Sequence, residues 1–418
     1  MIIRHIHDFI KQSLLDFPAV LLNGARQVGK STLAHQLQKI GIIDRYVTLD
    51  DLTVLRAAHT DPDGFLQQFQ GSVAIDEVQR APDLLRAIKK RIDEDRHPGR
   101  FLLTGSANVL SYPGVSESLA GRVDIIRLEG LSVGELYRQE KPSSFISDLF
   151  SGSSAYELVN HWNKILKNKP FIPKNDLSSL IYFGGFPDVT LKKDIRFRNR
   201  WFSSYETAYI DKDVRDLNRF LDIVSFSKLF HLAGLQTGSL LNQKNLSIEV
   251  GLDQRTVSRY LEILEITFQV HTLTPWFANT RKRLIKTPKV YTNDSGQASY
   301  LMGISSPDNL ISHPSFGGLL ETWAWSEIRK LLSITAGIEC SFYRTHLGKE
   351  VDFLLSHGMI HWGIECKAST NVSLKDCRGL TDMIEAIGPN TKGIILYAGD
   401  EVVSFADNII AVPFRILI

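Results

Sequence analysis

Cysteines are few in this sequence, and long apolar runs are absent. The three cysteines, Cys340, Cys366 and Cys377, form no CxxC pair, so neither a zinc ribbon nor a disulfide framework is indicated and reduced thiols are expected. No run approaches the roughly 18 consecutive apolar residues that a membrane span requires. Residues 1–17 mix charged with apolar side chains, which is typical of an amphipathic helix and not of a signal peptide. We therefore expect a soluble, cytoplasmic protein.

The chain also lacks a strong charge of either sign. It has 48 Lys and Arg residues against 46 Asp and Glu residues, for a net charge of +2, so no global field favours nucleic acid or an anionic membrane. Binding to either would require a local basic patch. With 418 residues, 43% of them hydrophobic and 22% charged, the chain is expected to form two to four globular domains.

Short apolar runs alternate with helical stretches from residue 18 to about residue 136. This alternation predicts an α/β domain in which helices cover both faces of a parallel sheet. The expected strands are 19–23, 46–49, 73–75, 101–104 and 125–128.

The rest of the chain changes character twice. A polar, serine-rich stretch at 141–154 predicts a linker or loop, and helical periodicity then extends from 155 to about 273. After Pro288 we expect a second α/β unit, with a helix at 318–332 and strands at 351–355, 360–366 and 393–397.

A phosphate-binding loop is predicted between the first strand and the helix that follows it. Residues 18–34 read PAVLLNGARQVGKSTLA and fit the pattern G-x4-G-K-[ST] without a mismatch. Glycines let backbone N–H groups wrap the phosphates, and the helix presents its positive N-terminal end to them. Lys30 should reach the β- and γ-phosphates, and Ser31 should coordinate Mg²⁺. The alternative is a glycine turn beside a surface lysine. The predicted ATP-binding residues are Gly24, Ala25, Arg26, Gln27, Val28, Gly29, Lys30, Ser31 and Thr32.

Two carboxylates end a second apolar strand, in the sequence SVAIDE at 72–77. A strand buried on both faces of a parallel sheet delivers such charges to a ligand at its C-terminal tip. We expect Asp76 to hold the magnesium shell. Glu77 is expected to act as a catalytic residue that orients and polarises the attacking water.

The strand at 101–104 leads into a polar tip, Gly-Ser-Ala-Asn, that looks like the sensor strand of AAA-type ATPases. Thr104, Ser106 and Asn108 are the candidates to contact the γ-phosphate or the water, and a turn or helix cap is the alternative for each. Arg122 follows in the sequence SLAGRV and suits an arginine finger that reaches a neighbouring subunit. Its alternative roles are a helix cap or an ion pair with Glu117.

A helix-turn-helix is predicted by residues 242–264, NQKNLSIEVGLDQRTVSRYLEIL. Gly251 suits the left-handed end of the first helix, and Asp253 suits the N-cap of the second. Arg255 and Arg259 lie near the end that would enter a major groove, although such modules also serve as scaffolds. Downstream, a basic run favours phosphate binding or is a solvated charged face, and it comprises Arg281, Lys282, Arg283, Lys286 and Lys289.

A nuclease-like site is predicted near the end of the sequence. An acid, Glu321, is followed by Asp352 and by Glu365-x-Lys367, which is the spacing of PD-(D/E)xK nucleases. Period two places Glu365 and Lys367 on one face of a strand. Asp352 and Glu365 are therefore expected to bind a divalent cation, with Glu321 and Lys367 nearby. The alternative is a structural ion pair between Lys367 and Asp352.

The motifs, in their order, resemble a group of prokaryotic AAA-type ATPases whose C-terminal half is a domain of unknown function. The resemblance spans nearly the whole chain and rests on GARQVGKST, AIDEVQ, LLTGSAN, LAGRV, GGFPD, YIDKDVRDL, the helix-turn-helix, KTPKVYTNDSG, GGLLETW and EVDFLL…IECK. It implies an ATP-driven protein with a DNA-binding-like winged helix and a nuclease-like end. The implied domains are an ATPase domain at 1–140, a helical lid region at 155–225, a winged helix-turn-helix region at 226–290 and a nuclease-like domain at 291–418.

Three hypotheses for function follow from this organisation, all with ATP and Mg²⁺ as cofactors. The first is an oligomeric, ring-type ATPase that controls metal-dependent DNA cleavage. The second is a non-cleaving ATP switch whose C-terminal half binds DNA or a protein partner. The third is a remodelling ATPase of the chaperone kind.

Overall fold

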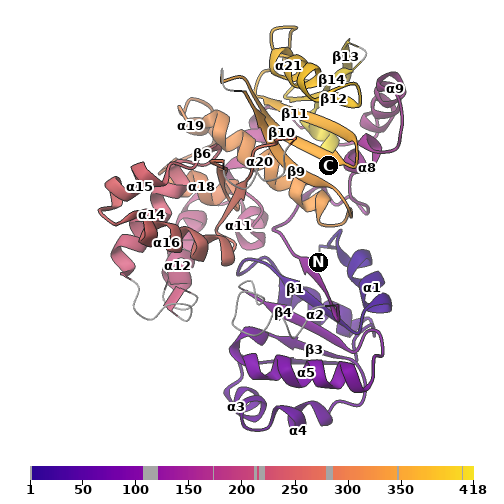
Figure 1. Ribbon diagram of the computed structural model, residues 1–418, viewed down its shortest axis with the longest axis vertical. Coiled ribbons are helices and arrows are strands. Elements are labelled where there is room, and N and C mark those ends of the chain that lie inside the picture. Colours follow the sequence, from indigo (N-terminus) through magenta and orange to yellow (C-terminus); the bar gives the residue numbers. More distant parts are fainter. Residues whose placement is uncertain are drawn as a thin grey trace.

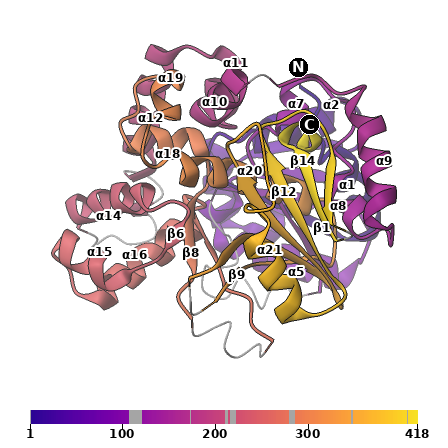
Figure 2. The ribbon, with the colours of Figure 1, turned by 90° about the horizontal axis from the view of Figure 1, so that it is seen from above.

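The computed structural model describes most of the chain and arranges it in three parts. The described residues are 2–106, 121–172, 174–210, 214–215, 222–278, 286–345, 348–406 and 408–418. The N-terminal domain lies at the bottom of Figure 1, a helical region lies at the left, and a second sheet lies above both. Seen from above, this second sheet lies over the N-terminal domain (Figure 2). None of the helices in the described ranges is long and apolar enough to cross a membrane.

The N-terminal sheet has five strands in the order β2-β3-β4-β1-β5, and every neighbouring pair is parallel. The predicted parallel sheet is therefore confirmed, with strand ends within one or two residues of those expected. The three central strands, β1, β3 and β4, form because their apolar runs are buried on both sides. The edge strands β2 and β5 are partly exposed. The strands are β1 Ala19–Asn23, β2 Arg45–Thr48, β3 Val73–Asp76, β4 Phe101–Gly105 and β5 Val123–Arg127.

Helices cover both faces of this sheet. Val20 and Leu22 of β1 pack in one core with residues of the first two helices, and Ala19 and Leu21 pack in a second core on the other face. The predicted N-terminal helix begins only at His7, because residues 2–6 run as an irregular segment against the domain. The helices are α1 His7–Asp16, α2 Lys30–Lys39, α3 Leu52–Thr60, α4 Pro62–Gln67, η1 Val78–Arg80 and α5 Pro82–Glu94.

The stretch 141–154, predicted as a linker or loop, contains a short buried helix. Phe145 and Ile146 of this helix lie in the main core. The indole of Trp362, far along the chain, donates a hydrogen bond to the Leu149 carbonyl at 2.6 Å. The linker prediction was wrong because it rested on the serines of this stretch and did not consider the apolar pairs Phe145-Ile146 and Leu149-Phe150 between them. The helices here are α7 Val133–Leu136, α8 Phe145–Leu149 and α9 Ala155–Leu166, and α9 packs on the second sheet.

The middle of the chain is helical, as predicted, and also contains a small antiparallel sheet in the order β6-β8-β7. Its strands are β6 Ser239–Leu240, β7 Val270–Leu273 and β8 Lys289–Thr292. Its helices are α10 Lys174–Phe183, α11 Pro187–Lys192, α12 Ile195–Tyr209, α14 Ile223–Leu235, α15 Gln243–Val250, α16 Gln254–Ile266, α18 Ser295–Leu301 and α19 Pro307–Ile311.

A mixed sheet of six strands, in the order β13-β14-β12-β11-β10-β9, forms the last part of the chain. Strands β9, β10 and β11 are antiparallel neighbours, whereas β11, β12 and β14 are parallel. The long helix α20 (Phe316–Leu332) precedes the sheet, α21 (Arg378–Ile387) connects β11 to β12, and η4 (Phe414–Leu417) follows it. The strands are β9 Glu339–Arg344, β10 Glu350–His357, β11 Ile360–Lys367, β12 Thr391–Tyr397, β13 Val403–Ala406 and β14 Ile409–Pro413.

Candidate functional site: the phosphate-binding loop and its neighbours

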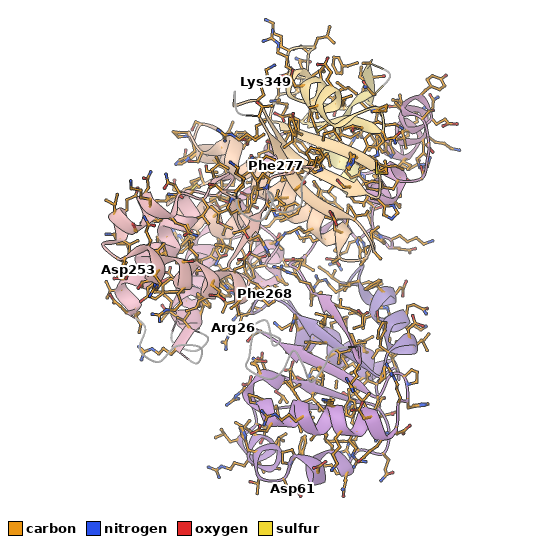
Figure 3. All side chains as sticks on the ribbon, in the orientation of Figure 1. Arg26, Asp61, Asp253, Phe268, Phe277 and Lys349 are labelled. Atoms are coloured by element: carbon orange, nitrogen blue, oxygen red, sulfur yellow. The ribbon has the colours of Figure 1, made fainter. Side chains whose placement is uncertain are left out.

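The loop between β1 and α2 contains two glycines with positive φ angles, Gly24 and Gly29. Gly24 has φ +154°, and a Cβ built there would lie 2.2 Å from the Leu128 carbonyl oxygen, so no other residue fits. Gly29 has φ +103° and immediately precedes the first residue of α2. Arg26 lies on the side of the domain that faces the helical region (Figure 3). Strand, glycine loop and helix thus follow one another as a phosphate site requires.

Lys30 lies over this loop. Its Nζ donates hydrogen bonds to the carbonyl oxygens of Gly24 and Ala25, each at 2.8 Å. The side chain is buried although it carries a charge. A buried ammonium with carbonyl partners within a glycine loop is well placed to exchange those partners for phosphate oxygens.

Asp76 collects hydroxyl groups from three other elements. Its carboxylate accepts hydrogen bonds from Ser31 Oγ at 3.0 Å and from the Tyr46 hydroxyl at 2.7 Å. Thr104 Oγ1 also donates to it. Burial and the hydrogen bond to Asp76 raise the pKa of Tyr46. The structure therefore brings together Ser31, Asp76 and Thr104, three of the predicted residues, and adds Tyr46, which the sequence analysis missed.

Glu77 adopts a left-handed conformation, with φ +59°, just after β3. Such a conformation is costly for a residue with a side chain and is concentrated at functional sites. Gln79 donates hydrogen bonds both to the Glu77 carboxylate and to Ser106 Oγ, the latter at 3.0 Å. Gln79 was also missed, although it lies two residues after the acidic pair. Asn108 lies outside the described residues.

Arg122 lies at the opposite edge of the sheet from the loop of its own chain. It precedes Val123, which pairs with Ala19 at the start of β1, whereas the loop follows the end of β1. Its guanidinium binds Asp93 through Nε at 2.6 Å and Nη2 at 3.0 Å. Glu117, the partner considered from the sequence, lies outside the described residues. The role of Arg122 as a finger in a neighbouring subunit stays a prediction.

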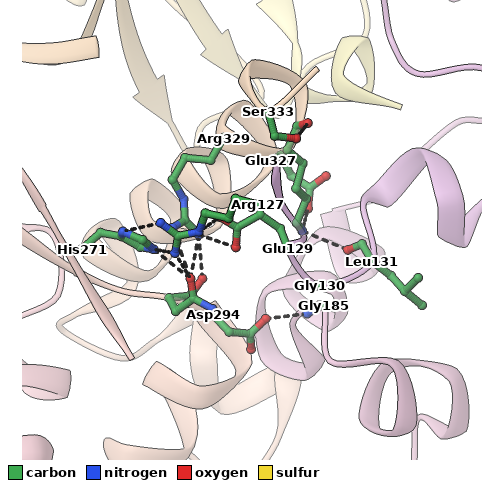
Figure 4. Close-up of polar contacts among 12 residues, drawn as sticks. Arg127, Glu129, Gly130, Leu131, Gly185, His271, Asp294, Glu327, Arg329 and Ser333 are labelled. Atoms are coloured by element: carbon green, nitrogen blue, oxygen red, sulfur yellow. Dashed lines mark hydrogen bonds and ion pairs between the residues drawn. The ribbon is translucent and has the colours of Figure 1, made fainter. Parts of the chain in front are cut away.

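The end of β5 contacts the other two parts of the molecule, as Figure 4 shows. Arg127 pairs with Glu129 at 2.7 Å and touches the ring of His271 in β7. Arg329 of α20 reaches Glu129 at 3.5 Å. Burial, together with Arg127 and Arg329, lowers the pKa of His271 well below its ordinary value, so its ring is neutral. We call Arg127, Glu129, His271, Asn293 and Arg329 the junction. Except for Asn293, which lies in the stretch KTPKVYTNDSG, no sequence motif marks these residues, and the sequence analysis assigned none of them a role.

The two helices of the predicted helix-turn-helix are present with their expected ends. Gly251 has φ +82° and ends α15, and the Asp253 side chain accepts a hydrogen bond from the Thr256 backbone N–H at 3.0 Å as the N-cap of α16. Arg255 and Arg259 are exposed on α16. The residues Arg281, Lys282 and Arg283 of the basic run lie outside the described residues.

Lys289, which the basic run placed among solvated or phosphate-binding side chains, is instead 1% exposed. Its Nζ lies 2.7 Å from Glu321 Oε1, 2.5 Å from Glu350 Oε1 and 3.9 Å from Asp352 Oδ1. Although burial opposes its charge, the carboxylates raise the pKa of Lys289. The grouping of Lys289 with the basic run was therefore wrong, because β8 turns this side chain inward. Tyr291, two residues further along β8, also donates to Glu321.

The predicted nuclease-like residues lie near this lysine. Lys367 Nζ binds Glu365 Oε1 at 2.9 Å, and Asp352 accepts a hydrogen bond from the Cys366 backbone N–H at 2.8 Å. Burial and neighbouring Asp352 raise the pKa of Glu321 to about 8 and that of Glu365 to about 7. Within the described ranges, no group of three His, Cys, Asp or Glu residues is placed to hold a metal ion. The ammonium of Lys289 supplies positive charge there instead.

Three segments of the chain match known protein families. Residues 16–137 match the AAA domain family. Residues 174–308 match the domain of unknown function DUF8612, and residues 316–417 match the domain of unknown function DUF4143. Together with the parallel sheet and the glycine loop, the first match indicates that the N-terminal part has the fold of a P-loop ATPase and is similar to the AAA domain family.

Two relatives align in sequence with nearly the whole chain, and two solved structures align with about two thirds of it. An uncharacterized protein of Mycobacterium bovis and one of Mycobacterium tuberculosis are each 27% identical over 406 residues, which cover 97% of this chain and 82% of each relative. The Walker-type ATPase of Pyrococcus abyssi has a TM-score of 0.40 and 14% identity, covering 71% of this chain and 94% of that one. A RuvB variant of Thermotoga maritima has a TM-score of 0.30 and 18% identity, covering 64% and 88%.

Proposed function

We propose that this protein binds and hydrolyses ATP with Mg²⁺ at the loop 24–32, and that its nucleotide state controls the helical and C-terminal parts. The observation that carries the proposal is the convergence of Lys30, Ser31, Asp76 and Thr104 at the C-terminal edge of one parallel sheet. Ser31 and Asp76 would hold the Mg²⁺ shell, since hydroxyl and carboxylate oxygens are its usual ligands.

The hydrolytic step needs a carboxylate near the attacking water. Glu77 is the acid at the tip of β3 that is not engaged by Ser31. Its carboxylate accepts a hydrogen bond from Gln79, which also donates to Ser106 Oγ. Asn108 completes the proposed set of γ-phosphate contacts. In an oligomer, Arg122 would have to leave Asp93 to reach a neighbour's phosphate.

Removal of the Lys30 ammonium tests the ATP site. Lys30→Ala should lower the affinity for Mg·ATP by about 100-fold, because a charge-assisted contact to phosphate disappears. Calorimetry on the full chain measures this loss. Lys39→Ala is the matched control, because it removes a lysine from the far end of the same helix. Unchanged affinity in Lys30→Ala would reject the assignment.

DNA binding by α16 is part of the proposal, supported by the two exposed arginines near its N-terminal end. If Arg255 and Arg259 touch phosphates, affinity for a duplex should fall steeply with salt, and each substitution by Ala should reduce the log–log slope by about one. Fluorescence anisotropy at several salt concentrations measures the slope. If neither substitution changes the duplex affinity or its salt dependence, the helix-turn-helix of α15 and α16 serves as a structural scaffold and not as a DNA-binding module.

A second candidate function is metal-dependent cleavage of nucleic acid at Asp352 and Glu365, with Glu321 and Lys367 nearby. It is favoured by Lys367, which binds Glu365, and by the raised pKa values of Glu321 and Glu365, which result from burial and from repulsion by Asp352. Because Lys289 already neutralises part of this cluster, we place the non-cleaving ATP switch first. Cleavage of single- or double-stranded DNA assayed with Mn²⁺, with and without ATP, decides between the two.

A further inference from the structure

We infer that helix α20 sets the affinity of the phosphate-binding loop for nucleotide, through Arg329, the segment 128–131 and the positioning residue Arg4. This inference rests on the proposed ATP-binding function and adds the residues that would regulate it. Neither Arg4 nor Arg329 belongs to the nucleotide motifs, and they are separated by more than three hundred residues of sequence.

Arg4 connects the loop to the segment after β5. Its Nη1 donates to the Val28 carbonyl at 2.8 Å, just before Gly29 and Lys30. Its Nη2 donates to the Glu129 carbonyl at 2.7 Å and the Gly130 carbonyl at 3.1 Å. The rigid guanidinium therefore fixes the position of one backbone relative to the other, which a single ammonium cannot do.

The buried carboxylate of Glu135 holds Arg4 in this place. It accepts from Arg4 Nε at 3.1 Å, and both side chains are less than 10% exposed. A buried guanidinium with a carboxylate and three carbonyl partners has little freedom to move alone. Movement of the 129–130 backbone is therefore transmitted to Val28.

The other end of the loop touches the same segment. The Leu128 backbone N–H donates to the Asn23 carbonyl at 2.7 Å, and the Leu128 carbonyl faces the Cα of Gly24. One end of the glycine loop thus contacts Leu128 directly, and the other end is joined to Glu129 and Gly130 through Arg4. A small shift of this segment would change the spacing of the N–H groups that bind phosphate.

Helix α20 grips this segment at three successive points. Arg329 pairs with Glu129 at 3.5 Å, and Lys330 Nζ donates to the Leu131 carbonyl at 2.9 Å. Glu327 accepts from the Val133 backbone N–H at 2.8 Å. Three charged residues within one turn of one helix thus bind residues 129–133, which packing alone does not require.

The middle of the chain meets α20 at the same place. Arg329 donates to the Asn293 carbonyl at 3.0 Å, and the Leu131 backbone N–H donates to the Gly185 carbonyl at 2.7 Å. In Figure 4, Arg329 lies beside Arg127 and Glu129, and Gly185 lies near Gly130. A movement of the helical region or of α20 relative to the ATPase domain would therefore displace the segment 128–131 and, through it, the phosphate-binding loop.

Coupling of this kind is reciprocal. If α20 changes the affinity for nucleotide by some factor, nucleotide must change the equilibrium of the α20 contacts by the same factor. Typical couplings between sites are about 5- to 150-fold. We therefore expect Arg329→Gln and Arg4→Gln each to weaken binding of Mg·ATP about 10-fold. The KM for ATP should rise, while kcat at saturation stays within about threefold, because Asp76, Glu77 and Thr104 are untouched.

The experiment compares these variants by calorimetry with Mg·ATP in the full chain. The double variant should bind about as weakly as the weaker single variant, because both substitutions interrupt one route. Arg329→Lys, which keeps the charge opposite Glu129, should recover most of the affinity. Arg198→Gln is the matched control. Arg198 is a fully buried arginine that donates to the carbonyls of Tyr182 and Gly296 at 3.0 and 2.9 Å, and its side-chain hydrogen bonds to described residues stay within α10, α12 and α18.

Three results would overturn the inference. They are unchanged affinity in folded Arg329→Gln, independent and additive losses in the double variant, and an equal loss in Arg198→Gln. If Arg329→Gln does not fold, Lys330→Met replaces it with the same expected sign. Failure of the proposed function is separate, since the unsubstituted protein would then bind no Mg·ATP at all.

Discussion

Glu77→Gln is expected to lower the rate of ATP hydrolysis about 100- to 1,000-fold while Mg·ATP still binds. The amide keeps the shape of the side chain and its contact with Gln79, but it cannot polarise the attacking water. Asp76→Asn should instead weaken Mg²⁺ binding, because it removes the negative charge of the carboxylate that Ser31 and Tyr46 also contact. Phosphate release under saturating ATP measures the rate, and calorimetry measures the binding.

Glu94→Gln is the control for the Glu77 experiment. Glu94 ends α5 on the surface of the same domain, so its carboxylate should have no effect on either measurement. A wild-type rate in Glu77→Gln would show that another group positions the water, with Ser106 and Asn108 the next candidates.

Lys289→Met is expected to lower the free energy of unfolding by about 3–5 kcal/mol, the usual cost of leaving buried charges without their partner. Glu321, Glu350 and Asp352 would then face one another without the ammonium. Chemical denaturation in the presence of EDTA measures the loss. Lys349→Met is the control, since Lys349 pairs with Asp382 at 2.6 Å in a half-exposed setting where such pairs contribute about 0–1 kcal/mol.

The loss in Lys289→Met should depend on pH with a definite sign. The pKa of Glu321 is already raised to about 8, so the folded state binds more protons than the unfolded state from about pH 4.5 to pH 8. The contribution of Glu321 to the free energy of unfolding therefore decreases as the pH rises from about 4.5 to about 8. The difference between Lys289→Met and the unsubstituted protein should be larger at pH 8 than at pH 6. Equal differences would mean that the carboxylates do not depend on Lys289.

The same variant tests the predicted metal site. Without Lys289, a divalent cation can take the place of the ammonium, so Mn²⁺ should raise the melting temperature of Lys289→Met. The measurement is made with Lys30→Ala also present, to exclude the ATP site. Asp352→Asn should abolish the rise. No rise in the first variant would mean that Asp352 and Glu365 hold no metal.

Much of the N-terminal domain could be predicted because its information is local. The central strands β1, β3 and β4 come from short apolar runs, and the glycine loop needs only eight residues to be recognised. The groups around Asp76 could not be predicted in the same way. Tyr46 lies near Asp76 because the neighbouring strand pairs in the register that sets Thr48 opposite Asp76. The position of Gln79 depends on the left-handed backbone conformation of Glu77.

Lys289 shows why charge patterns mislead. In the sequence it closes a basic run, and only the fold reveals three carboxylates opposite its strand. The pair Lys289 and Tyr291, spaced by two within a β-strand, both point at Glu321, and this spacing is the one signal that could have indicated an inward face. Arg4 offers no such signal, because three of its partners are backbone carbonyls and the fourth, Glu135, lies far along the sequence.

Helices α8 and α9 have a consequence for how the chain folds. They are synthesised before the strands of the sheet on which they pack. The Leu149 carbonyl can accept its hydrogen bond only after Trp362 has been synthesised, and the Ser153 carbonyl, which accepts from Lys392 Nζ at 3.0 Å, only after Lys392. Such distant contacts slow folding and leave apolar surface uncovered during synthesis. A fragment limited to 316–417 would lack these helices and would expose Trp362, so it should aggregate unless residues 141–166 are supplied with it.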